Sequence, residues 1–172
     1  MKTLFRTTLM TVAITSMISC KNESKSADET ADTTEAVAVA TDGLSFNDDK
    51  VGKQFQHYIH LKTALVNSDV EEAQSGAEML MENTDDAALK ESLTTIAQSG
   101  DIDEQRKHFA DVTAKITAVV DGAISNGEVY KQYCPMAFNG EGGYWLSKEE
   151  EIRNPYFGDK MLKCGTVAET IK

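Results

Sequence analysis

After residue 48, apolar side chains recur every three or four positions, the spacing that places them on one face of an α-helix. Four such stripes follow one another as far as residue 127, and each predicts an amphipathic helix with one buried face. Lys62 falls on the apolar face of the first helix. The apolar members of the stripes are Val51, Phe55, Tyr58, Ile59, Leu65 and Val66; Ala73, Ala77, Leu80 and Met81; Leu89, Leu93 and Ile96; and Phe109, Val112, Ile116, Val119, Val120 and Ala123.

Polar residues before the stripes predict where the helices begin. Ser68 starts a capping-box sequence for the second helix, and Asp101 starts one for the fourth. Thr84 or Asp85 can cap the third helix. Short connections between helices of these lengths favour antiparallel neighbours. The predicted fold class is therefore mainly all-α, an up-down four-helix bundle over residues 46–127.

The pattern changes after residue 127, where turn-forming residues separate short aromatic segments. Gly140 to Gly143 and Asn154-Pro155 are the clearest turns. We expect an irregular, turn-rich C-terminal lobe over residues 128–172, packed on one end of the bundle, with room for a small β-hairpin around Tyr144-Trp145-Leu146. The bundle and the lobe together form one predicted domain, residues 46–172.

The first residues form a predicted lipoprotein signal peptide, residues 1–19. Lys2 and Arg6 are positively charged, and the apolar run from Leu9 to Ile18 is too short to span a bilayer. A small residue precedes Cys20, as in a bacterial lipobox, so Cys20 is the predicted lipidation site and first mature residue. The alternative is an ordinary secretory peptide in which Cys20 is incidental.

Residues 20–45 are predicted to be a disordered acidic tether. They are rich in Ser, Thr, Ala, Asp and Glu, and such a segment cannot bury enough apolar surface to offset the entropy lost on ordering. A lipid on Cys20 would hold the domain at a membrane through this tether. The expected location is the cell envelope, on the periplasmic face of the outer membrane, with surface exposure as an alternative.

The chain is acidic, with a formal net charge of −11 that becomes −13 once Lys2 and Arg6 leave with the leader. Such a charge repels nucleic acid and favours cations, so no nucleic-acid partner is expected. The sequence contains no metalloprotease, serine-hydrolase or phosphate-loop motif. Its carboxylates fall on predicted exposed faces. We therefore predict no catalytic residue and no enzymatic activity.

Four sulfur-containing side chains gather in the lobe: Cys134 and Met136 on one segment, and Met161 and Cys164 on another. Thiolates and thioethers are soft ligands that select Cu(I) and, by similar logic, Ag(I). The alternative is a structural disulfide between Cys134 and Cys164, with the methionines as packing residues. The two states exclude each other, because an oxidised pair cannot bind the ion. Composition alone favours the disulfide.

Two of the three histidines complete the candidate ligands. His57 and His60 are spaced i, i+3 on the first helix, a spacing that can chelate a metal, although both point away from the apolar stripe. We interpret them as solvated residues or as auxiliary ligands. His108 borders the stripe of the fourth helix and is predicted to be a partly buried core-edge residue. Arg106 is predicted to pair with a carboxylate.

The sequences C-P-M-A, W-L-S, N-P-Y-F-G-D-K-M-L and C-G of the lobe, with Tyr58 to Leu65 and Arg106 to Phe109, resemble a small bacterial domain of unknown function. That domain occurs in envelope lipoproteins and C-terminal to periplasmic adaptor subunits of copper and silver efflux pumps. The resemblance implies a copper-handling context and an efflux adaptor or other envelope protein as partner. It places the soft-metal site beside the disulfide as an equal alternative. The expected function is Cu(I) or Ag(I) binding for buffering or delivery; the alternative is a disulfide-stapled interaction module that binds no metal.

Overall fold

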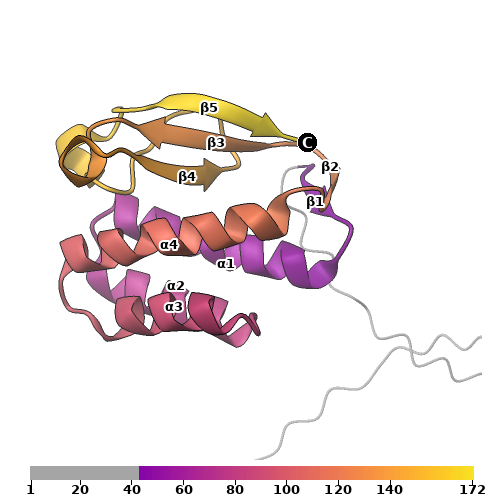
Figure 1. Cartoon of the computed structure of the whole chain (residues 1–172), viewed down its shortest axis with the longest axis horizontal. Helices are drawn as coiled ribbons and strands as arrows, with labels where there is room; N and C mark the ends of the chain where they lie inside the picture. Colours follow the sequence, from indigo (N-terminus) through magenta and orange to yellow (C-terminus); the bar gives the residue numbers. More distant parts are fainter. Residues whose placement is uncertain (1–42) are drawn as a thin grey trace, which may run out of the picture. The chain divides into compact units, whose positions relative to one another are not determined.

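The computed structural model describes residues 43–172, which form four helices, two short 3-10 turns and five strands (Figure 1). A mainly helical fold is therefore confirmed. The helices are α1 (Asp49–Val66), α2 (Val70–Glu82), α3 (Ala87–Gln98) and α4 (Ile102–Val120). The strands are β1 (Ser45–Phe46), β2 (Ile124–Asn126), β3 (Val129–Cys134), β4 (Gly143–Ser147) and β5 (Thr166–Ile171), and the turns are η1 (Ala137–Gly140) and η2 (Gly158–Met161).

Each helix begins after an aspartate whose side chain accepts a hydrogen bond from a backbone N–H of the first turn. Asp101 caps α4 as predicted. Helices α2 and α3 are capped by Asp69 and Asp86, which follow the predicted cap residues. Ser68 cannot serve as the cap because it ends α1: its φ is 56° and its N–H donates to the Leu65 carbonyl.

The predicted stripes supply most of the core. Burial of apolar side chains is the main force that stabilises such a fold. Lys62, on the same face of α1, is buried with them at 4% exposure. The buried members of the stripes are Phe55, Tyr58, Leu65, Val66, Ala73, Ala77, Leu80, Leu89, Leu93, Ile96, Phe109, Val112, Ile116 and Val120.

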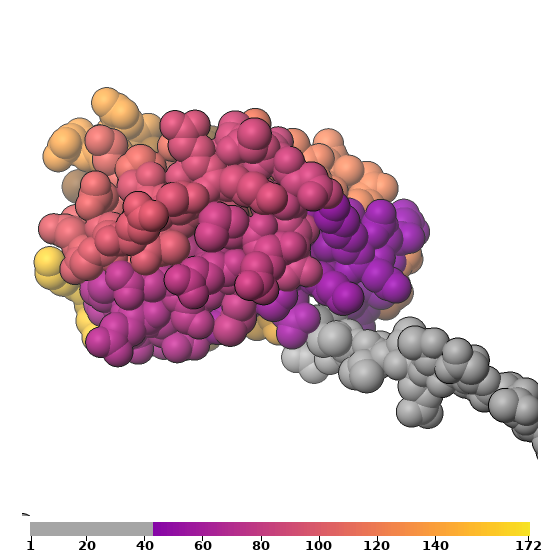
Figure 2. Space-filling model, turned by 90° about the horizontal axis from the view of Figure 1, so that it is seen from below, coloured from indigo at the N-terminus to yellow at the C-terminus, as the bar shows by residue number. Residues whose placement is uncertain are grey.

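The helices lie in two layers beneath the larger sheet. Consecutive helices pack against each other, and α1 also packs against α4. In Figure 1, α1 and α4 lie next to the sheet and α2 and α3 lie on the far side. Figure 2 shows the molecule from below, and α2 and α3 cover most of this face. Helices α1 and α4 are thus the middle layer, between the other two helices and the strands.

The lobe contains a three-stranded antiparallel sheet in the order β4-β3-β5, while β1 and β2 form a separate pair. The hairpin predicted around Tyr144-Trp145-Leu146 is confirmed as β3 and β4. The prediction of an otherwise irregular lobe is wrong, because β5 completes a sheet. The sequence does not predict β5, because β5 is an edge strand with most of its side chains exposed. Its residues therefore lack the alternation of apolar and polar side chains that identifies a strand.

The sheet lies along α1 and α4, not at one end of the helices as predicted (Figure 1). Tyr58 of α1 makes the central polar connection. Its hydroxyl accepts a hydrogen bond of 2.9 Å from the Leu146 N–H of β4 and is 2.9 Å from Thr113 Oγ1 of α4. One hydroxyl therefore joins two helices to the backbone of an edge strand.

Within residues 43–172, none of the helices combines the length and the apolar character needed to cross a membrane. The predicted signal peptide, Cys20 and most of the predicted tether lie outside the described residues. The buried Leu44 and Ser45, the first residue of β1, fall inside the range 20–45 assigned to the tether. The described structure thus includes residues that the prediction assigned to the tether.

Candidate functional site

Cys134 and Cys164 lie together although 30 positions separate them in the sequence. Their Sγ atoms are 3.2 Å apart, and both thiols are free. Cys134 is the last residue of β3, lies opposite Gly143 of β4 and is fully buried. Cys164 precedes β5 and is half-buried. The pair connects the central strand to the segment that leads into the third strand.

Asn154 holds the segment that contains Cys164. Its side-chain amide donates a hydrogen bond of 2.8 Å to the Cys164 carbonyl, and its backbone N–H donates to the Leu162 carbonyl at 2.9 Å. Its side-chain oxygen accepts from the Tyr156 N–H, the Asx turn expected of an asparagine before proline. The sequence predicts this turn. It does not predict the bond to Cys164, because that bond depends on the path of the chain from Asn154 back to the sheet.

Gly165 allows the chain to pass close to the sheet immediately after Cys164. Its φ is 147°, and a Cβ atom there would lie 2.8 Å from the Trp145 ring and 2.9 Å from the Tyr133 carbonyl. Both distances are shorter than a side chain tolerates, so only glycine fits this position. The Cys164-Gly165 pair thus combines a thiol with the close approach that brings it to Cys134.

The Cys134 thiol affects the protonation of the Cys164 thiol. The hydrogen bond with Cys134 raises the pKa of the Cys164 thiol, and burial adds to the rise. A second negative charge is unfavourable beside the first when two sulfurs are this close. Cys164 is therefore protonated at neutral pH, and a metal ion that binds here must displace that proton.

The predicted methionine ligands lie on the same short segments as the cysteines. Met136 is 55% exposed, although burial would stabilise an apolar side chain. Met161 is half-buried, and its carbonyl accepts a 3.0 Å hydrogen bond from the Cys164 N–H. Each thioether is thus one short turn from a thiol, and its part in a metal site stays a prediction.

The histidines of α1 lie at the contact with α2 and are half-buried, where the sequence predicts solvated positions. His60 Nε2 is hydrogen-bonded to Glu72 of α2. Burial lowers the pKa of His57, and the neighbouring His60 lowers it further.

No three His, Cys, Asp or Glu side chains within residues 43–172 are grouped closely enough to hold a metal ion. His108 is half-buried, as predicted.

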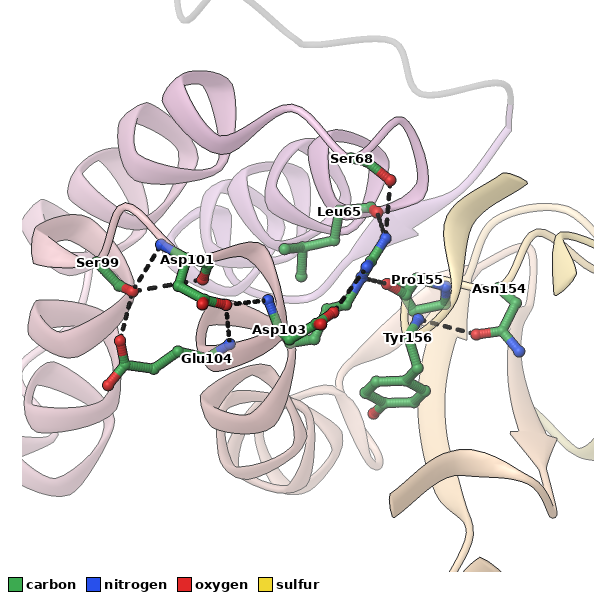
Figure 3. A network of polar contacts seen from close by, with 10 residues as sticks. Leu65, Ser68, Ser99, Asp101, Asp103, Glu104, Asn154, Pro155 and Tyr156 are labelled. Atoms are coloured by element: carbon green, nitrogen blue, oxygen red, sulfur yellow. Dashed lines mark hydrogen bonds and ion pairs between the residues drawn. The ribbon is translucent and has the colours of Figure 1, made fainter. Parts of the chain in front are cut away.

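The Arg106 side chain donates four hydrogen bonds, one of which reaches the lobe (Figure 3). Its Nη1 donates to Asp103 at 3.1 Å, which confirms the predicted carboxylate partner. Its Nε donates to the Pro155 carbonyl at 2.8 Å, and its Nη2 donates to the Leu65 carbonyl at 3.1 Å and to Ser68 Oγ at 2.9 Å. One buried guanidinium therefore joins the end of α1, the start of α4 and the Asn154-Pro155 turn.

Gly158 makes room for this guanidinium. Its φ is 56°, and a Cβ atom there would lie 2.8 Å from Arg106 Nη2 and 2.7 Å from Ser68 Oγ. The glycine of N-P-Y-F-G is thus required by a residue far away in the sequence. Only the presence of a turn glycine is visible from the sequence alone.

A comparison with family models matches residues 55–127 to a protein of unknown function (DUF3347). The match covers less than half of the 172-residue chain and coincides with the helical part. It confirms a domain of unknown function there and ends before the Cys134 to Gly165 segment. Searches of curated proteins and of solved structures found no match.

Proposed function

We propose that this protein binds a soft metal ion, Cu(I) or Ag(I), through the thiolates of Cys134 and Cys164, for buffering or delivery in metal homeostasis. The observation that supports this function is the 3.2 Å approach of two free thiols from distant parts of the sequence. One of them is half-exposed, so an ion can reach it. Two thiolates are the donors that Cu(I) and Ag(I) prefer.

Met136 and Met161 are the proposed additional ligands. An exposed thioether two residues from a thiol contributes little to packing but can complete the coordination of a soft ion. His57 or His60 is a proposed auxiliary ligand. His60 would have to leave Glu72, so we expect the histidines to contribute less than the sulfurs.

Metal binding requires a small movement of the cysteines. Two metal–sulfur bonds of about 2.3 Å at a tetrahedral angle place the sulfurs about 3.8 Å apart. The observed separation is 3.2 Å, so the sulfurs would separate by roughly half an ångström. Cys164 follows a short turn, and a small rotation of its side chain can supply this shift.

A disulfide-stapled interaction module that binds no metal is the second candidate. The sulfurs need approach by only about 1.2 Å to reach the disulfide distance. Closing this loop would stabilise the lobe by roughly 3–4 kcal/mol in the chain-entropy model. The absence of a three-residue His, Cys, Asp or Glu cluster within residues 43–172 also favours this candidate.

The proposal includes the cellular context inferred from the sequence. The domain would be held in the cell envelope by a lipid on Cys20 and an acidic tether, with an efflux-pump adaptor or another envelope protein as partner. Its scaffold would be an up-down four-helix bundle, which the packing of consecutive helices and their short connections support.

A Cu(I) competition titration of the reduced protein tests the site. Cys134→Ser or Cys164→Ser should nearly abolish binding, because only the thiolate brings charge to the cation. Met136→Leu or Met161→Leu should weaken it, and His108→Ala is the matched control that should leave it unchanged. The metal site is wrong if the reduced wild type binds no Cu(I), or if both serine variants bind as the wild type does.

Thiol counting on protein purified from its native envelope separates the two candidates. Free thiols at Cys134 and Cys164 favour metal binding, and an intact disulfide favours the interaction module.

A further inference from the structure

A cavity of about 410 Å³ lies where the first turns of α4 meet two segments of the lobe. Its volume falls in the range of pockets that bind small molecules. None of the cysteines or histidines within residues 43–172 lines it, so it is distinct from the proposed metal site except for Met136. Its lining residues are Asp103, Arg106, Met136, Ala137, Phe138, Asn139, Tyr156, Phe157 and Lys160.

The cavity is positively charged in an acidic protein. Arg106 and Lys160 bring two cations to the lining, whereas Asp103 is its single carboxylate. The chain as a whole has a formal charge of −11. Asp103 is already paired with Arg106 at 3.1 Å, so the charge of Lys160 is not balanced within the lining. An anion is therefore the complementary ligand.

Arg106, which lines this cavity, has one N–H group beyond those in its four hydrogen bonds. Four of its N–H groups donate to Pro155, Asp103, Leu65 and Ser68. A guanidinium has five such groups, and the fifth, on Nη1, has no partner within residues 43–172. The side chain is only 5% exposed, so its position is fixed by the surrounding protein. A fixed guanidinium N–H is a good donor to a carboxylate.

Apolar groups form the rest of the lining. The Phe138 and Tyr156 rings pack edge to face with centroids 4.9 Å apart, and Phe157 and Ala137 extend this surface. Phe138 and Asn139 both have left-handed backbone conformations, with φ of 52° and 58°. Such a conformation is unfavourable for a bulky residue and is found where the surrounding structure imposes it, often at binding sites.

We propose that this cavity binds a small organic carboxylate with an apolar body. The carboxylate would contact Lys160 and the unused N–H of Arg106, and the apolar body would lie against Phe138 and Phe157. This inference goes beyond metal binding, because the ligand needs neither thiol. It is tested on metal-free protein, so its outcome is independent of the Cu(I) titration.

Three probes of the same shape and different charge test the proposal: 3-phenylpropionate, 3-phenylpropanol and 3-phenylpropylamine. We expect ligand-detected NMR titrations to show the acid binding most tightly, the alcohol more weakly and the amine most weakly. The proposal is overturned if none of the three binds, or if the amine binds as tightly as the acid.

Variants of exposed charged residues identify the binding groups without disturbing the core. Lys160→Met should weaken binding of the acid about two- to fivefold, the range for one exposed charge pair, and leave the alcohol unchanged. Asp103→Asn should strengthen acid binding by a similar factor, because it removes the competing carboxylate. Lys163→Met, an exposed lysine outside the lining, is the matched control. Wild-type acid affinity in both Lys160→Met and Asp103→Asn would refute the assigned contacts.

Discussion

Lys62 is a charged side chain in a largely apolar place. Only 4% of its surface is exposed, and its Nζ lies 3.4 Å from Ser147 Oγ at the end of β4. Burial lowers the pKa of Lys62; Glu149 opposes this effect, and Arg153 and Lys148 add to it. The ammonium is thus placed where its charge is poorly solvated, which costs the folded state free energy.

Replacing Lys62 should reveal that cost. A base whose pKa is lower in the folded state binds fewer protons there than in the unfolded state. The free energy of unfolding therefore rises with pH between the lowered pKa and the ordinary value of 10.5. We expect Lys62→Met to raise the free energy of unfolding near neutral pH by about 1 kcal/mol. This gain should shrink as the pH approaches the ordinary lysine pKa. Urea unfolding of both proteins at neutral and alkaline pH measures it.

Lys53→Met, at an exposed position of the same helix, is the control for that experiment. It should change the free energy of unfolding by no more than about 0.5 kcal/mol. A Lys62→Met protein that is less stable than the wild type at neutral pH, or whose gain does not vary with pH, would contradict the prediction.

At the scale of elements, the join between β4 and the helices depends on a polar contact in an apolar layer. Leu146 is fully buried, and its N–H is directed to the Tyr58 hydroxyl because β4 has no strand on its outer side. Burial raises the pKa of Tyr58, so the hydroxyl stays neutral and keeps both of its hydrogen bonds. The helix layer thereby supplies the acceptor for this buried N–H of the sheet.

Tyr58→Phe should therefore lower the free energy of unfolding by more than the loss of one exposed hydroxyl would. It leaves a buried backbone N–H without an acceptor, which costs about 1–3 kcal/mol. Chemical denaturation measures the change in the free energy of unfolding. Tyr144→Phe is the matched control, because Tyr144 is 46% exposed. Equal effects of the two substitutions would show that the Tyr58 contact contributes nothing specific.

At the scale of the whole molecule, the described domain and the residues before it have separate roles in the proposal. The folded part needs no lipid for its core, because the helices and the sheet bury their apolar surfaces against each other. Attachment to a membrane is assigned to Cys20 alone. Folding and localisation should then respond to different substitutions.

Cys20→Ser should release the protein from the membrane fraction, because the lipid is the proposed anchor. Its thermal unfolding midpoint should match that of wild-type protein solubilised in detergent, since Cys20 is not among the described residues that form the core. Cell fractionation followed by thermal unfolding checks both expectations. Recovery of Cys20→Ser in the membrane fraction would count against the lipobox prediction.

The helical half of the fold could be predicted from the sequence because its signals are local. The stripe that includes Leu89, Leu93 and Ile96 is visible within three turns of chain, and all three residues are buried. Caps are similarly local, and Asp101 is the cap residue that the sequence predicted correctly. The prediction of Ser68 as the cap of α2 is wrong, because the Ser68 N–H donates to a carbonyl at the end of the preceding helix.

The candidate site was only partly predictable, because its residue types are local and its geometry is not. Two thiols, turn glycines and an Asn-Pro turn can be recognised in the last forty or so residues from the sequence alone. The three-dimensional structure alone places β5 beside β3, which brings Cys164 to 3.2 Å from Cys134. It also decided that Arg106 meets Pro155, because hydrogen bonds between distant residues depend on packing and leave no periodic signal in the chain.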